Sequence, residues 1–83
     1  MTGVILYRLF YSGDPFAIPM SAVAYLDVGQ DPDDPNTWRL KITTVDGSSF
    51  TPGEGTKEYC ERKFQILTSA ISENQGIIDV TEW

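Results

Sequence analysis

The sequence predicts an α+β fold: a small antiparallel β-sheet of about five strands, in the order β-β-β-β-α-β, with one amphipathic helix packed on one face. The clearest observation is a hairpin. Residues 38–45 alternate apolar and polar side chains, the period of a half-buried strand, and Asp46-Gly47 suits a tight turn before residues 48–51. Residues 57–73 instead repeat apolar side chains at steps of three and four, which predicts a helix with one buried stripe.

Size and composition predict a single domain over residues 1–83. A chain of this length buries only about 60–65% of its unfolded surface, so we expect a small core. Cys60 is the only cysteine, which excludes an internal disulfide and favours a reducing, cytoplasmic location. The residues after Met1 lack the segments of a signal peptide, and no apolar run approaches the roughly 18–20 residues of a membrane helix.

The charge balance argues against two kinds of ligand. The formal net charge is −6, with six Lys and Arg scattered along the chain and no histidine. Nucleic acids and anionic membranes are bound largely through basic side chains, so we expect no direct contact with either. The same acidity favours solubility or a basic protein partner.

The first expected strand, residues 4–11, is apolar on both faces. Only Arg8 interrupts the face that carries Val4, Leu6 and Phe10. A strand of this kind needs cover on both sides. Either the helix and loops cover both sides, or a second copy of the chain buries one face. Because the helix stripe covers only one face of the sheet, we expect a second copy to bind, at the spare face of this strand or at the final strand, residues 77–83. This predicts a homodimer interface at Val4, Leu6 and Phe10.

The remaining elements are expected in the following places. Residues 12–15 form a turn and residues 22–28 a second strand. Residues 29–37 form a loop, because two prolines and three aspartates exclude a helix interior and a central strand. Thr56 is the N-cap of the helix, and residues 77–83 form the last strand, at an edge of the sheet.

The densest charge cluster is Asp27, Asp31, Asp33 and Asp34. Several carboxylates suit a calcium ion, but the spacing lacks the sixth-position glycine and late glutamate of a helix-loop-helix calcium loop, so no metal site is predicted. A solvated acidic turn is the ordinary interpretation. A third interpretation is a recognition tip, in which Asp31, Asp33 and Asp34 face a basic partner.

The aromatic side chains form a second set of candidates for partner binding. Tyr and Trp are enriched at interface hot spots, but in a small protein they also build the core. We expect Trp38 and Phe50 to lie in the core. Tyr25 and Trp83 suit either role, and we place them with the partner-binding residues.

Gly55, Thr56 and Lys57 form a weak candidate anion site at the start of the helix. Amides at a helix N-terminus attract phosphate, and Lys57 adds a positive charge. The segment lacks the phosphate-loop pattern, however, and Glu54 would repel an anion. A flexible connection with a helix cap is the alternative interpretation.

Catalysis is not predicted. Cys60 falls on the buried stripe of the helix, and the sequence has no histidine to act as base for a cysteine or serine nucleophile. The glutamates of the helix are expected to be solvated surface charges rather than a paired acid and base. We therefore expect no catalytic residue and no cofactor.

These observations favour one function and leave two alternatives. The leading hypothesis is a non-enzymatic cytosolic interaction module that self-associates and binds a protein partner. The first alternative is a small acidic phage or mobile-element inhibitor of a nucleic-acid-handling or defence system, with carboxylates placed where phosphates normally sit. The second is an oligomer that binds a small molecule or anion at residues 53–57.

Overall fold

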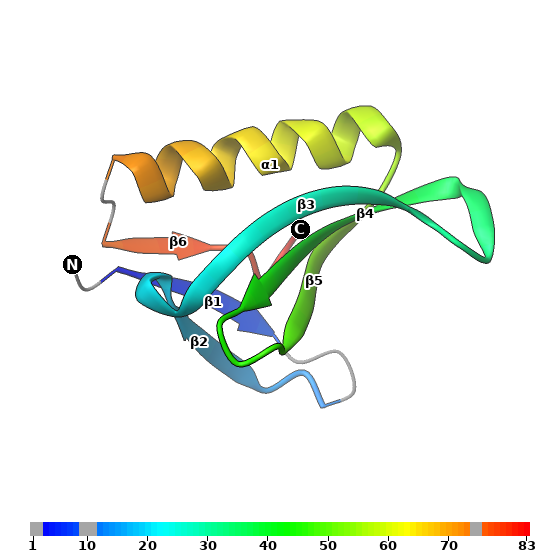
Figure 1. The fold of residues 1–83 in the computed structure, drawn as a ribbon. Coiled ribbons are helices and arrows are strands. Elements are labelled where there is room, and N and C mark those ends of the chain that lie inside the picture. The colour runs from blue at the N-terminus through cyan, green and yellow to red at the C-terminus, as the bar shows by residue number, and fades with distance from the viewer. Residues whose placement is uncertain (1–2, 9–11, 74–75) are drawn as a thin grey trace.

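A computed structural model describes residues 3–8, 12–73 and 76–83 of the protein. Within these ranges the chain forms six strands, one 3₁₀ turn (η1) and one α-helix (Figure 1). In chain order they are β1 (Val4–Arg8), β2 (Pro15–Pro19), η1 (Met20–Ala22), β3 (Val23–Asp31), β4 (Asp34–Thr44), β5 (Ser49–Gly55), α1 (Lys57–Ser72) and β6 (Ile77–Asp79). The predicted α+β class is confirmed.

The strands form two three-stranded sheets, β2-β1-β6 and β3-β4-β5, which corrects the single sheet predicted from the sequence. In the first sheet β1 is central, antiparallel to β2 and parallel to β6. The expectation of a purely antiparallel sheet is therefore also wrong. The reason is that α1 carries the chain back along the molecule before β6, so that β6 runs in the same direction as β1.

Strand β2 was not predicted, because Pro15 and Pro19 indicate turns. The Met20 N–H donates to the Gly3 carbonyl over 2.8 Å and continues the β1–β2 ladder. Since alternate residues of an antiparallel strand bond to the neighbour, both prolines lie at positions whose backbone faces away from β1. Their missing N–H groups cost no ladder bond there, and Ala17 keeps the only N–H on that edge of β2.

The loop predicted over residues 29–37 is wrong. Strand β3 continues to Asp31 and β4 begins at Asp34, so that a two-residue turn, 32–33, joins two long strands. This hairpin protrudes beyond the rest of the molecule (Figure 1). Pro35 is tolerated within β4 because the pairing with β5 begins only at Trp38, which leaves Pro35 with a neighbouring strand on one side alone.

The β4–β5 hairpin is confirmed, but its turn is longer than the sequence suggests. The Thr44 N–H donates to the Ser48 carbonyl over 2.9 Å, and the Gly47 N–H donates to the Thr44 carbonyl over 3.0 Å. These bonds enclose a three-residue loop, 45–47. Gly47 has a φ of 91°, a conformation that side-chain-bearing residues adopt only with strain.

Helix α1 begins where the sequence predicts and ends one residue earlier, at Ser72. The Thr56 hydroxyl accepts a hydrogen bond from the Tyr59 N–H over 3.1 Å, which confirms Thr56 as the N-cap. The buried side chains of the helix are Cys60, Leu67 and Ala70. Burial raises the pKa of the Cys60 thiol, as expected for a cysteine on the core side of a helix.

One core joins the helix to both sheets. Ile5 of β1, Leu40 and Ile42 of β4, and Leu67 of α1 are completely buried. Helix α1 packs against all three strands of the β3-β4-β5 sheet. The core cluster consists of Ile5, Ile18, Met20, Leu40, Ile42, Leu67, Ala70, Ile78 and Val80.

The two aromatic residues predicted for the core differ in their placement. Phe50 is partly buried against the core, and its ring centre lies 5.4 Å from those of both Tyr7 and Phe16. Trp38 is half-buried outside the core cluster, where the Lys57 Nζ lies 5.2 Å from the centre of its ring. The prediction for Trp38 is therefore wrong: its ring meets the Lys57 ammonium group rather than the core.

Candidate interaction surfaces

The side of the β2-β1-β6 sheet that faces away from the core is mostly apolar, with Arg8 and Asp79 as its charged residues. Paired residues of neighbouring strands point to the same side of a sheet. The register pairs Val4 with both Pro19 and Ile77, and Leu6 with Ala17. We call these five residues the outer apolar face.

The outer apolar face is not part of the core. Ile77 is 63% exposed, Ala17 and Pro19 are exposed, and Val4 and Leu6 are half-buried. None of the five belongs to the core cluster found among the described residues. The structure thus places two predicted interface residues, Val4 and Leu6, together on this face, whereas Phe10 lies outside the described residues and its role stays a prediction.

Charges of both signs border the outer apolar face. The Arg8 guanidinium donates to the Gly13 carbonyl over 2.6 Å. Asp79, paired with Leu6 in the sheet register, accepts hydrogen bonds from the Thr81 N–H over 2.9 Å and the Thr81 hydroxyl over 2.6 Å. These bonds, with a smaller contribution from Arg8, lower the pKa of Asp79. Asp79 is therefore ionised at neutral pH, on a border that also holds the Arg8 guanidinium.

The hairpin tip, residues 31–34, gathers the three aspartates predicted to bind a partner. Asp31 is held in place: its Oδ2 lies 2.9 Å from an Arg39 guanidinium nitrogen, and its Oδ1 accepts from the Asp33 N–H over 2.9 Å. Arg39 also lies 3.4 Å from Glu54. The positive charge of Arg39 thus offsets part of the negative charge of Asp31, which directly precedes the turn.

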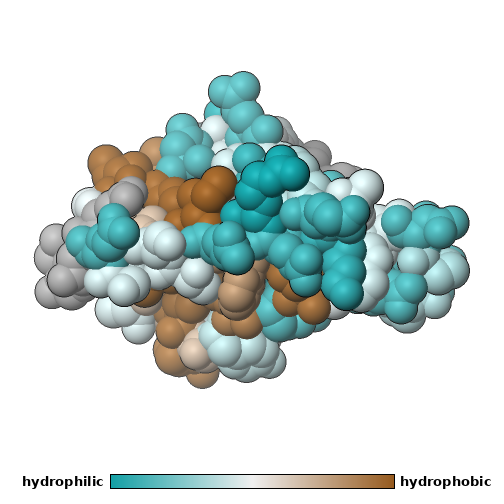
Figure 2. Space-filling model, turned by 90° about the horizontal axis from the view of Figure 1, so that it is seen from above, coloured by the Kyte–Doolittle hydropathy of each residue, from teal (hydrophilic) through white to brown (hydrophobic). Residues whose placement is uncertain are grey.

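The other two tip carboxylates differ from Asp31. Asp34 accepts bonds from the Thr37 hydroxyl over 2.8 Å and the Asn36 N–H over 3.0 Å, and these two bonds lower its pKa. Asp33 is exposed, and within the described ranges its carboxylate has no hydrogen bond or ion pair. The end of the arm is strongly hydrophilic in Figure 2. Asp33 and Asp34 therefore carry the accessible negative charge of the tip.

The aromatic candidates do not lie with the aspartates. Tyr25 is 58% exposed near the start of β3, about 20 Å along the strand from Asp31. Trp83 packs against the core and is half-buried, with the Lys63 Nζ 5.1 Å from its ring. The predicted partner-binding residues are thus spread over three places, and only Asp31, Asp33 and Asp34 lie together.

The residues of the weak anion site are engaged with their own neighbours. Thr56 caps the helix, and Lys57 lies over the Trp38 ring. Gly55 has a φ of 155°, and a side chain there would begin 3.4 Å from the Tyr59 ring. The arrangement matches the helix-cap alternative, and anion binding at this point stays a prediction.

No cluster suited to metal binding was found in the part of the chain that the structure describes. Cys60 is a free, fully buried thiol. Across the same residues, no helix is both long and apolar enough to span a membrane.

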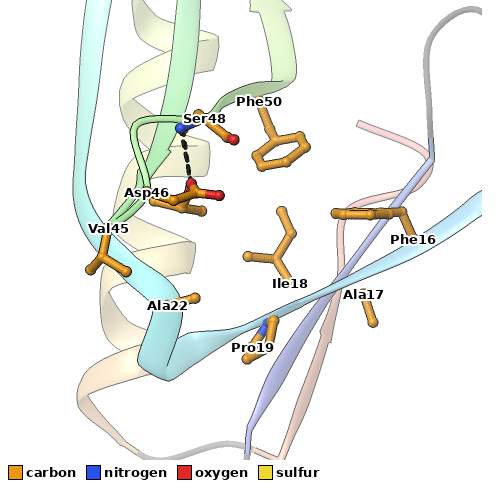
Figure 3. Close-up of a pocket in the computed structure, with 10 residues that line it drawn as sticks. Phe16, Ala17, Ile18, Pro19, Ala22, Val45, Asp46, Ser48 and Phe50 are labelled. Atoms are coloured by element: carbon orange, nitrogen blue, oxygen red, sulfur yellow. Dashed lines mark hydrogen bonds between the residues drawn. The ribbon is translucent and has the colours of Figure 1, made fainter.

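A cleft of about 290 Å³ separates β2 from the β4–β5 turn (Figure 3). Its walls are mostly apolar, and Asp46 is the charged residue in its lining. A second cavity, of about 490 Å³, lies between β5, Tyr7 and Trp83. Neither cavity is predictable from the sequence, because each depends on how the two sheets approach each other.

Acid should weaken the fold through three aspartates. Hydrogen bonds lower the pKa of Asp34, Asp46 and Asp79 below the usual 3.8. A lowered folded-state pKa stabilises the fold above pH 3.8, and this stabilisation is lost as the pH falls toward the lowered values. We expect the triple variant Asp34→Asn, Asp46→Asn, Asp79→Asn to lose less stability than the unaltered chain between about pH 5 and pH 2. Urea unfolding at a series of pH values checks this, and equal losses would contradict it.

Comparison with known proteins adds no family to these observations: no protein-family model, no curated protein and no solved structure matches the chain.

Proposed function

We propose that this protein is a non-enzymatic interaction module that forms a homodimer through its outer apolar face and presents its hairpin tip to a basic protein partner. The outer apolar face is the observation that carries the proposal. Residues of three strands bring five apolar side chains together on the side of the sheet away from the core. Removing apolar surface from water stabilises an assembly by about 25 cal/mol per Å².

The charge distribution favours a second copy as the occupant of this face. The acidic residues of the tip would repel their own copies, because the chain carries a net charge of −6. The outer apolar face instead has an uncharged centre and a border with both Arg8 and Asp79. A two-fold contact places identical surfaces against each other, so a face without excess charge is the one suited to it.

The dimer should dissociate on dilution. Two strands of five residues and one of three span at most roughly 17 by 14 Å. This footprint is smaller than the roughly 800 Å² that each partner buries in a stable complex. We therefore expect a monomer in dilute solution and a dimer in concentrated solution.

Ile77→Lys is expected to abolish the dimer, because it places a charge at a position of the outer apolar face that is 63% exposed. Sedimentation equilibrium should give a mass that rises from 9.3 kDa toward twice that value for the unaltered chain, and that stays at 9.3 kDa for Ile77→Lys. Leu6→Lys serves as a second variant on the central strand, provided that circular dichroism shows the native fold.

The matched control is Ile66→Lys. Ile66 is 43% exposed on α1, and the substitution makes the same change of charge away from the outer apolar face. Its mass should rise with concentration as for the unaltered chain. A monomer at every concentration, or equal loss of the dimer in Ile66→Lys and Ile77→Lys, would contradict the proposal.

The second part of the proposal, a basic partner at the hairpin tip, is supported by the exposed charges of Asp33 and Asp34 at the end of a protruding arm. Asp33→Asn with Asp34→Asn should weaken binding of an oligolysine peptide and make it less sensitive to salt. Glu58→Gln with Glu61→Gln removes the same charge from the exposed face of α1 and should weaken binding less. Equal weakening of oligolysine binding in the two double variants would show that the net charge of the protein, and not the hairpin tip, attracts the peptide.

A cytoplasmic location is also part of the proposal. Its support is Cys60, a free thiol buried in the core, since a reducing compartment keeps such a thiol reduced.

A further inference from the structure

The cleft between β2 and the β4–β5 turn combines apolar walls with one carboxylate. Phe16, Ile18 and Phe50 form the apolar side, and Val45, which is 72% exposed, stands at its border. The Phe16 and Phe50 rings lie 5.4 Å apart, centre to centre. In Figure 3 these side chains border an open space that has Asp46 on its other side. The cleft therefore offers an apolar surface and a negative charge to the same ligand.

The Asp46 carboxylate is held in one orientation. Its Oδ1 accepts hydrogen bonds from the Thr44 hydroxyl and from the Ser48 N–H, the latter over 3.1 Å. These bonds, with a further contribution from the Ser48 side chain, lower the pKa of Asp46, so the group is ionised at neutral pH. Within the described residues, Oδ2 accepts no hydrogen bond. One oxygen thus fixes the turn, while the other is available to a ligand.

We propose that this cleft binds a small aliphatic ammonium, with its hydrocarbon chain against Phe16, Ile18 and Phe50 and its ammonium group on Asp46. The ligand is expected to be a cation, because Asp46 and the net charge of −6 both repel anions. The ligand is expected to be small, because the cleft volume of about 290 Å³ is near the lower limit of the volumes of ligand pockets. A short linear amine such as hexylammonium is small enough for this volume.

Hexylammonium, hexanol and hexanoate form a matched set of probes, because they share the hydrocarbon chain and differ in charge. Titrations followed by ¹H–¹⁵N spectra should show saturable shifts of the Ile18, Asp46 and Ser48 amides with hexylammonium. Hexanol should bind about 1.4- to fivefold more weakly, the usual range for an exposed ion pair, and hexanoate more weakly still. Absence of saturable shifts with hexylammonium, or equal affinity for hexanol, would overturn the proposal.

Two single-charge variants test the role of Asp46. Asp46→Asn keeps an oxygen acceptor for the turn and removes the charge, so it should reduce the affinity for hexylammonium to that for hexanol. Glu61→Gln removes one charge from the exposed face of α1, outside the lining of the cleft, and should leave both affinities unchanged. Equal loss in the two variants would mean that net charge, rather than the cleft, attracts the amine. Should Asp46→Asn fail to fold, the comparison of the three probes on the unaltered chain decides alone.

Discussion

Leu67→Ala is expected to lower the free energy of unfolding by about 2–5 kcal/mol, because it opens a cavity at a site that cannot easily collapse. Leu67 is completely buried in the core that joins α1 to both sheets. A domain of 83 residues has a total stability of about 4–12 kcal/mol, so this single change removes a large part of it. Urea unfolding followed by circular dichroism measures the loss.

The control for Leu67→Ala is its neighbour in the sequence, Ile66→Ala. Ile66 is 43% exposed, so truncating it should cost less than about 1 kcal/mol. Both substitutions place alanine in the same helix, which leaves burial as the main difference between them. Equal losses in the two variants would mean that α1 does not pack on the sheets as described.

Trp83→Ala is expected to cost about 2–4 kcal/mol, somewhat less than the loss of a fully buried tryptophan. The Trp83 side chain packs against the core, lies close to Gly53, and carries Lys63 over its ring. The Trp83 N–H also donates to the Val80 carbonyl over 3.2 Å.

Glu82→Ala is the matched control for Trp83→Ala. Glu82 is exposed, so its loss should change the stability by less than about 0.5 kcal/mol. Thermal and urea unfolding of both variants separate a packing role of Trp83 from a role in partner binding. An unchanged stability of Trp83→Ala would favour the partner-binding role that the sequence left open.

The parts of the fold that could be predicted are those whose signals are local. The helix was predictable because its apolar side chains recur at helical spacing and Thr56 suits an N-cap. The β4–β5 hairpin was predictable from alternation and the Asp46-Gly47 pair. Its turn type was not, because two- and three-residue loops use similar residues.

The sequence-based predictions of strands β2 and β4 were wrong because prolines, which usually interrupt a strand, lie there at positions that need no backbone N–H. Pro15 and Pro19 lie on the outward backbone positions of an edge strand, and Pro35 lies in the part of β4 that extends beyond β5. Composition alone predicts that a strand ends at each of these prolines. The pairing partners decide whether a missing N–H matters, and those partners are set by the tertiary fold.

The candidate surface was predictable only in part. The apolar character of both faces of residues 4–8 indicated an uncovered side and identified Val4 and Leu6. Ala17, Pro19 and Ile77 were not identified, because they join this side only through the registers of β2 and β6 with β1. The cleft at Asp46 was missed for a similar reason, since its walls come from separate segments of the chain.

The most direct test of the proposed self-association is a concentration series of ¹H–¹⁵N spectra of the unaltered chain. We expect amide shifts to change with concentration at Val4, Leu6, Ala17 and Ile77 and to remain constant at the hairpin tip. Concentration-dependent shifts confined to other surfaces, or none at any concentration, would contradict dimerisation through the outer apolar face.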